Sequence, residues 1–268
     1  MNLDGPMTAP KALLYLFVAL ALFFLMLPNF MVFPFSISPT SLMEFPPRGF
    51  SWQWYEKYFT QPGWLRATWI SFYVAILTTI ISVTIGSLAA YGLVRGTFGG
   101  KRAINALILL PIIVPTLLTA VAIFKLYSNL RLTGTTFGFV IGHSVLAVPF
   151  VITIMAATLR GIDPAIEDAA RNLGASRLKT VWRVTFPLAK QGMMSAGLFS
   201  FLVSFDELLI AVFISSPTVY TLPKKLWEGI RLEIDPSLAA VSSILVIVSV
   251  VILALAGFAK LKMDKAEE

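Results

Sequence analysis

Long apolar runs recur along this chain and are separated by short polar segments. A helix needs roughly 20 apolar residues to cross a bilayer core about 30 Å thick. The runs that meet this requirement lie at about residues 12–35, 67–94, 103–127, 137–159, 192–214 and 238–259. The pattern therefore predicts an all-α membrane protein with six transmembrane helices. We expect the first run to be a retained anchor, because no small-residue cleavage site follows it.

Prolines lie within two of these runs, Pro111 and Pro115 in the third and Pro149 in the fourth. A proline removes a backbone donor, and neighbouring helices can satisfy the carbonyl groups that it frees. We therefore expect these prolines to interrupt their spans. Gly86 with Ala90, and Gly138 with Gly142, place small residues four apart, a spacing that lets helix backbones pack closely.

The composition agrees with a membrane location. Hydrophobic residues make up 57% of the chain and charged residues only 13%, whereas a soluble domain has about 25% charged residues. The formal net charge is +7, but the basic residues lie in short segments between apolar runs, which argues against a nucleic-acid interface. The chain has no cysteine, so it offers neither disulfides nor a thiolate metal site.

The distribution of lysine and arginine predicts the orientation, because short cytoplasmic loops are enriched in these residues. With both termini inside, more than half of the 21 basic residues are cytoplasmic, including Arg95, Lys101 and Arg102 in one short loop. We therefore predict a multi-pass protein of the inner (plasma) membrane with N- and C-termini in the cytoplasm. Segment 160–190 is then cytoplasmic as well, and the outer segments are 36–66, 128–135 and 216–236.

The outer segment 36–66 is rich in proline and aromatic residues. Its rings belong to Trp52, Trp54, Tyr55, Tyr58, Phe59 and Trp64. Two interpretations remain open for it: an aromatic belt at the membrane–water interface, or a docking surface for an external partner.

The cytoplasmic segment 160–190 has the most informative pattern. Asp163 can cap a helix that begins at Pro164, and Gly174 can end that helix. Glu167 and Arg171 stand four apart and are expected to pair across one turn. We expect a second short helix at 176–184, ending before Pro187.

Small and apolar residues give the first of these two helices a hydrophobic side, formed by Ala169, Ala170 and Leu173. Such a helix suits either a groove on a partner protein or the membrane interface.

Residues 167–175, followed by Pro187 and Leu188, resemble the EAA loop of ABC importer permeases. The family pattern is approximately E-A-A-x-x-x-G with I-x-L-P downstream. This chain departs from it at Asp168, which precedes the alanine pair, and at 184–187. The resemblance extends from residue 67 to the C-terminus, and more loosely over the first span. It implies a type I ABC importer permease (MetI-like) fold.

In such permeases the first helix of the loop is a coupling helix, inserted into a cleft on an ATPase subunit. The residues that the resemblance assigns to coupling with the ATPase are Glu167, Ala169, Ala170, Arg171, Leu173 and Gly174. ATP and Mg would bind to that ATPase, since this chain has no G-x-x-x-x-G-K-[ST] segment and no cofactor of its own is expected. The implied partners are an ABC ATPase dimer, a second permease subunit (another copy or, as the polyamine-type resemblance favours, a paralogue), a periplasmic or lipid-anchored substrate-binding protein and membrane lipid, without nucleic acid.

The expected domain organisation follows from the spans and the loop. Residues 1–66 would form the first transmembrane helix with the outer interfacial segment. Residues 67–260 would form a permease core of five transmembrane helices that contains the coupling loop 160–190, and residues 261–268 a cytoplasmic tail.

A narrower resemblance concerns the solute. Segments 204–207 and 217–223, together with the outer segment 45–51, are similar to permeases of spermidine/putrescine-type importers. This implies the permease subunit of an ATP-driven, binding-protein-dependent importer of polyamines. Opines, amino-acid-like solutes and phosphonates remain alternatives, because relatives with the same pattern are associated with them.

Asp206 and Glu207 lie inside the fifth apolar run, where charged groups are costly and usually face a bundle interior or an aqueous cavity. They can attract an ammonium-bearing solute, or pair with a basic residue and fix the bundle. With Trp227 they form the predicted substrate path, and Asp206 is the stronger of the two carboxylates. His143, the only histidine, is either a proton relay or a hydrogen-bonded packing residue.

The sequence contains no nucleophile–base pair and no metal-ligand cluster, so we predict a transporter subunit rather than an enzyme, with no catalytic residue and no metal site. Two other classes remain to be tested. An ATP-independent channel or carrier would leave the cytoplasmic loop without a partner. A membrane-embedded enzyme would have only Asp206, Glu207 and His143 as candidate groups.

Overall fold

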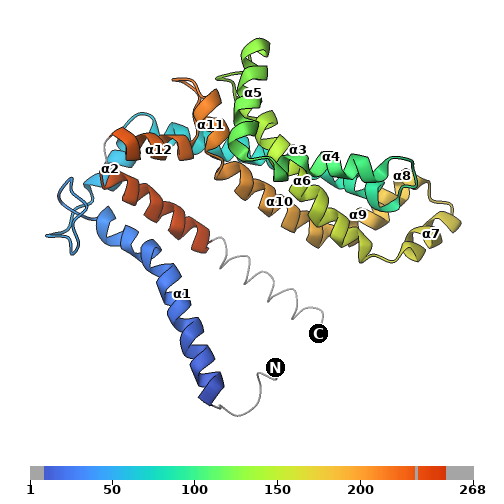
Figure 1. Ribbon diagram of the computed structural model, residues 1–268, viewed down its shortest axis with the longest axis horizontal. Coiled ribbons are helices and arrows are strands. Elements are labelled where there is room, and N and C mark those ends of the chain that lie inside the picture. The colour runs from blue at the N-terminus through green and yellow to red at the C-terminus, as the bar shows by residue number, and fades with distance from the viewer. Residues whose placement is uncertain (1–8, 233–234, 252–268) are drawn as a thin grey trace. The chain divides into compact units, whose positions relative to one another are not determined.

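The computed structural model describes residues 9–232 and 235–251, which are helical with connecting loops and include no strand (Figure 1). The helices are α1 (Ala9–Ser36), α2 (Gln53–Thr60), α3 (Trp64–Arg95), α4 (Lys101–Ile113), α5 (Thr116–Leu130), α6 (Thr136–Arg160), α7 (Pro164–Asn172), α8 (Arg177–Thr180), α9 (Phe186–Leu188), α10 (Lys190–Phe205), α11 (Leu209–Ile214) and α12 (Leu222–Leu232). A further helix, Ser237–Val251, follows α12.

The chain divides into two compact units. The first consists of residues 1–62 and 226–268, and the second of residues 63–225. The boundaries between the two units therefore fall between α2 and α3 and within α12.

Hydrogen bonds between polar side chains hold the first unit together. The hydroxyl of Tyr55 on α2 contacts Ser36 of α1 and Ser243 of the last helix, each at 2.8 Å. Lys57 on α2 pairs with Asp235 at the start of that last helix. Burial acts to raise the pKa of Asp235, but hydrogen bonds from Lys57 and Ser237 outweigh it and hold the pKa below its usual value.

The second unit is built on α3, α6 and α10, which pack against one another. Small residues allow the close approach: a Cβ on Gly86 of α3 would lie 2.6 Å from Val151 of α6. Ala90, one turn further on, is fully buried in the same interface. The predicted packing role of Gly86 with Ala90 is confirmed.

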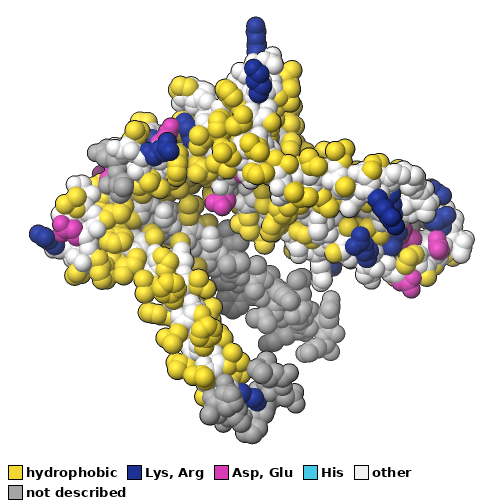
Figure 2. Space-filling view, viewed as in Figure 1, with side chains coloured by type: hydrophobic (Ala, Val, Ile, Leu, Met, Phe, Trp, Pro, Cys, Tyr) yellow, Lys and Arg dark blue, Asp and Glu magenta, His cyan; other side chains and the backbone are white. Residues whose placement is uncertain are grey.

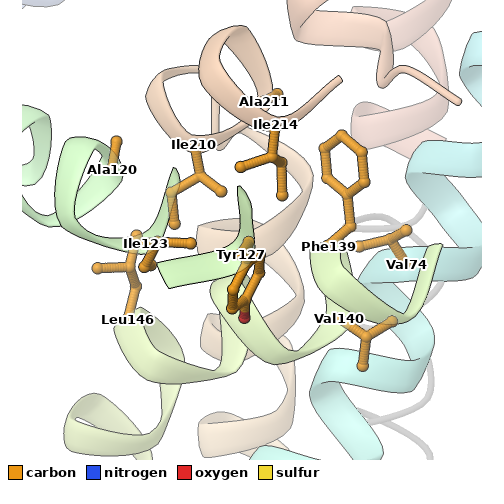
Figure 3. Close-up of a cluster of buried hydrophobic side chains, with 10 residues drawn as sticks. All are labelled: Val74, Ala120, Ile123, Tyr127, Phe139, Val140, Leu146, Ile210, Ala211 and Ile214. Carbon is orange, nitrogen blue, oxygen red and sulfur yellow. The ribbon is translucent and has the colours of Figure 1, made fainter. Parts of the chain in front are cut away.

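A second group of buried apolar side chains forms a separate cluster within this unit (Figure 3). Ile210, Ala211 and Ile214 of α11 lie against Ala120 and Ile123 of α5. The remaining members of the cluster are Val74, Tyr127, Phe139, Val140 and Leu146. The short helix α11 is therefore fixed by burial, although it has only 6 residues.

The predicted spans agree with the structure in part. Helices α1, α3 and α6 are long and apolar enough to cross a membrane. Helices α4 and α5 meet that criterion only as a pair, bent by 101° at Pro115. The fifth predicted span is also broken, at 206–208. The sixth predicted span is helical over Ser237–Val251, and its remainder and the predicted tail 261–268 lie outside the described residues. Pro149, in contrast, lies within the continuous α6, so the predicted interruption there is wrong.

Candidate functional site

The segment between α6 and α10 forms the short helices expected from its sequence. The carboxylate of Asp163 accepts a hydrogen bond from the backbone N–H of Ala165 at 2.9 Å, and Pro164 is the first residue of α7. Helix α7 ends at Asn172, and Gly174 follows with φ +89°. Glycine suits this left-handed conformation because it has no Cβ. The predicted cap, start and end of α7 are confirmed.

The predicted pair between Glu167 and Arg171 is wrong. Glu167 is 6% exposed, and its Oε1 accepts a hydrogen bond from Arg95 Nε at 2.9 Å. The hydroxyl of Tyr91 donates to Oε2 at 3.0 Å. Arg171 instead pairs with the exposed Asp168 at 3.2 Å. Glu167 lies on the side of α7 that faces α3, where a basic residue distant in sequence satisfies its charge.

Arg95 also holds the segment that precedes α7. One terminal guanidinium nitrogen, Nη2, donates to the carbonyl of Ile162 at 2.7 Å. Arg95 is the last residue of α3, so a single side chain links the end of α3 both to the α6–α7 connection, at Ile162, and to α7, at Glu167. The position of α7 is therefore determined by the core of the second unit.

The other side of α7 is open. Ala169, Arg171 and Leu173 are exposed and Ala170 is half-buried. Leu173, directly after the last residue of α7, is 90% exposed, the largest exposed fraction among the exposed large hydrophobic residues of the described part of the chain. Figure 2 shows that charged side chains gather at the end of the second unit that carries α7 and α8, whereas hydrophobic side chains cover the helices behind it.

The second short helix differs from its prediction. It begins as α8 after Ser176, passes through a π-helical turn at Val181–Thr185, and continues into α9, which contains Pro187. Pro187 is the second residue of α9, directly after the π-helical turn. The predicted end before Pro187 is therefore wrong.

Asp206 and Glu207 lie at the break between α10 and α11. Asp206 is exposed, and it follows the last residue of α10. Glu207 Oε1 accepts a hydrogen bond from the backbone N–H of Ile210 at 2.9 Å, within the first turn of α11. The two carboxylates thus have different surroundings. Glu207 is hydrogen-bonded to the N-terminal turn of α11, whereas Asp206 is exposed.

Three phenylalanines lie beside this break, and none of them is among the site residues predicted from the sequence. The rings of Phe201 and Phe205 stack at 5.6 Å between centroids, and Phe72 of α3 contacts Phe205 at 4.9 Å. The spacing of four residues between Phe201 and Phe205 was the available signal, because it places both rings on one face of α10.

Trp227 and His143 have separate environments. Trp227 belongs to the first unit, and the guanidinium of Arg231 lies 4.8 Å from its ring centroid. His143 is fully buried in the second unit, with Nδ1 2.9 Å from the hydroxyl of Ser204. This hydrogen bond agrees with the packing role proposed for His143. In the described part of the chain, no group of acidic and histidine side chains is arranged to hold a metal ion.

Comparison with known proteins identifies the family. A family model described as the binding-protein-dependent transport system inner membrane component matches residues 82–264, more than half of the chain. The spermidine/putrescine transport system permease protein PotC of Haemophilus influenzae is 26% identical over 208 residues, which cover 78% of this chain and 81% of that protein. The putrescine transport system permease protein PotI of Escherichia coli strain K12 is 27% identical over 229 residues, 83% of this chain and 81% of its own length. A probable molybdenum ABC transporter permease of Haloferax volcanii is 32% identical over 175 residues, 61% and 63% of the two chains.

Solved structures agree on the fold. A chain of a bacterial ABC transporter involved in import of the acidic polysaccharide alginate matches with a TM-score of 0.72 at 18% identity, covering 96% of this chain and 99% of that one. A chain of the MetNI methionine ABC transporter in an inward-facing conformation matches with a TM-score of 0.62 at 15% identity, covering 74% and 94%. Proteins of this family transport solutes and are not enzymes, and they work with ATPase, permease and binding-protein partners. The chain therefore belongs to the inner-membrane permease components of binding-protein-dependent transport systems, the permeases of ABC importers.

Proposed function

We propose that this chain is the permease subunit of a polyamine importer and that α7 is the helix through which an ATPase drives it. Two relatives, named as spermidine/putrescine and putrescine permeases, support the proposal that the solute is a polyamine. The exposed Leu173 on a helix fixed by the buried Glu167 supports the coupling role. A partner groove that takes up Leu173 would remove its apolar surface from water.

The proposal includes a cytoplasmic position for both termini and for α7, and a partner complex of an ATPase dimer, a second permease and a binding protein. Ala169, Ala170, Arg171, Leu173 and Gly174 form the surface offered to the ATPase. Glu167 acts as a positioning residue, because its carboxylate is directed at α3 rather than at solvent.

The observation that carries the solute assignment is the open carboxylate of Asp206 beside an aromatic cluster. A cationic amine is attracted both by a carboxylate and by the faces of aromatic rings. Phe205 directly precedes Asp206 and stacks with Phe201, so both kinds of group are present at one break in the helix. Glu207 is the weaker member of this path, since its carboxylate caps α11. The other predicted path residue, Trp227, belongs to the first unit, and Arg231 lies on its ring.

A molybdenum compound is the second candidate, suggested by the relative from Haloferax volcanii. Molybdate is an anion, and a carboxylate in the path would repel it. The charge at Asp206 thus predicts opposite effects for the two solutes: neutralisation weakens passage of a polyamine and does not weaken passage of an oxyanion.

The test is transport by the purified importer in proteoliposomes, with labelled spermidine and labelled molybdate. We expect the wild-type chain to copurify with a P-loop ATPase and to support spermidine uptake, and Asp206→Asn to lower that uptake at least tenfold with normal yield of the complex. Glu44→Gln, which neutralises a carboxylate in the first unit, is the matched control and should transport normally. Uptake of molybdate alone, unchanged spermidine uptake in Asp206→Asn, or loss of the complex in that variant would contradict the assignment.

A further inference from the structure

A basic cavity lies where α4 begins, outside the regions described above. Its volume is about 570 Å³, and its lining combines the cations Lys101, Arg102 and Arg160 with the apolar side chains of Leu93, Val94 and Phe98. No acidic residue lines it. We propose that this cavity binds an anionic phospholipid, with the phosphate of the head group at the basic residues and the acyl chains along the apolar wall.

The positive charge of the cavity is not compensated within the described part of the chain. Neither Arg102 nor Arg160 has a hydrogen-bond or ion-pair partner there. Lys101 donates to the carbonyl of Gly96 at 3.0 Å and retains two further donors. The first turn of α4 has no acidic residue, so the partial positive charge of the helix N-terminus adds to that of the side chains. The cavity is therefore suited to an anion.

The apolar wall selects a lipid rather than a free anion. Leu93, Val94 and Phe98 line the same cavity as the basic residues, and Phe98 is 45% exposed. The cavity therefore presents apolar surface next to its cations. A phospholipid would satisfy both features, because its phosphate and its acyl chains meet at the membrane surface.

The assignment of this cavity to the cytoplasmic side of the membrane rests on the proposed function. Arg160 ends α6 and is followed directly by the segment that leads into α7. If α7 meets an ATPase, the cavity lies at the cytoplasmic leaflet, where anionic lipids attract basic side chains. The lipid would fill the space between α4 and the ends of α3 and α6 and hold them together.

The test is a titration of the delipidated importer in detergent with phosphatidylglycerol, and separately with phosphatidylcholine, followed by native mass spectrometry. Each basic residue near an anionic surface contributes roughly a fivefold factor in affinity. We therefore expect Arg102→Gln/Arg160→Gln to weaken phosphatidylglycerol binding roughly 30-fold and to leave phosphatidylcholine binding unchanged. Asn105→Asp, at an exposed position of the lining, adds a carboxylate and should also weaken phosphatidylglycerol binding.

Lys125→Gln/Arg131→Gln is the matched control, since it removes two exposed cations on and just beyond α5 and should change nothing. Unchanged phosphatidylglycerol affinity in Arg102→Gln/Arg160→Gln and in Asn105→Asp would overturn the proposal. Competition by millimolar inorganic phosphate would also overturn it, because it would assign the cavity to a free anion. Loss of a partner subunit with unchanged lipid affinity would assign it to a protein contact. A wild-type chain that purifies without an ATPase would contradict the proposed function, while its lipid titration would still decide this inference.

Discussion

Glu167 connects the exposed helix α7 to the interior of the second unit. Both oxygens of its carboxylate are hydrogen-bonded, one to Arg95 and the other to Tyr91. A buried ion pair adds little stability by itself, but removing one partner leaves a costly unpaired charge. The pair therefore fixes where α7 sits relative to α3 rather than simply adding stability.

We predict that Arg95→Gln destabilises the permease by about 3 kcal/mol, because it leaves the Glu167 carboxylate buried and unpaired. The double variant Arg95→Gln/Glu167→Gln should recover part of that loss, since no charge is left behind. Thermal unfolding of the purified complex measures both. Asp168→Asn is the control: it breaks the exposed pair with Arg171, and such pairs contribute about 0–1 kcal/mol. Equal effects of Arg95→Gln and Asp168→Asn would show that the buried pair has no special role.

Among the helices, α3 is the one on which the packing of the second unit depends. It contacts both α6 and α10, and its buried positions are mostly small: alanine, serine, threonine and glycine. Helices in membranes associate through close packing rather than through the hydrophobic effect, so small residues at the contact matter. Two glycines of α3, Gly86 and Gly92, allow this to be tested because their surroundings differ.

We predict that Gly86→Ala lowers the stability of the complex by about 1–3 kcal/mol, because the added methyl group would overlap Val151 of α6. At Gly92 no heavy atom lies within 4 Å of an added Cβ. Gly92→Ala should therefore be neutral or slightly stabilising, because alanine has a higher helix propensity than glycine. Thermal unfolding of the two variants, compared directly, gives the result. A destabilisation of the same size at both positions would contradict tight packing between α3 and α6.

For the molecule as a membrane protein, the decisive property is which end of the second unit faces the cytoplasm. Most of the basic residues of this unit lie at one end of its helices: at the ends of α3 and α6, at the start of α4, and in the segment from α7 to the start of α10. The turn between α5 and α6 has only Arg131. Because basic residues are retained on the cytoplasmic side, the difference predicts the orientation.

We predict that a cysteine at Thr97 is protected from a membrane-impermeant maleimide in intact cells and reacts after permeabilisation. A cysteine at Asn129, in the last turn of α5, should react in both conditions. Both positions are exposed, and the chain contains no cysteine that would react in their place. Labelling of Thr97→Cys in intact cells would reverse the proposed orientation and remove α7 from the ATPase side.

The sequence by itself determined the helical class, the membrane location and the local structure of α7. These depend on interactions between near neighbours: the length of apolar runs, the cap at Asp163 and the glycine at 174. The tertiary structure decided what depends on distant residues. Arg95, rather than the neighbouring Arg171, satisfies Glu167, because burial against α3 favours the partner that shares the interior. The break at Pro115 was predicted from the proline, whereas the break between α10 and α11 emerged only from the structure, in which α11 packs against α5 and α6.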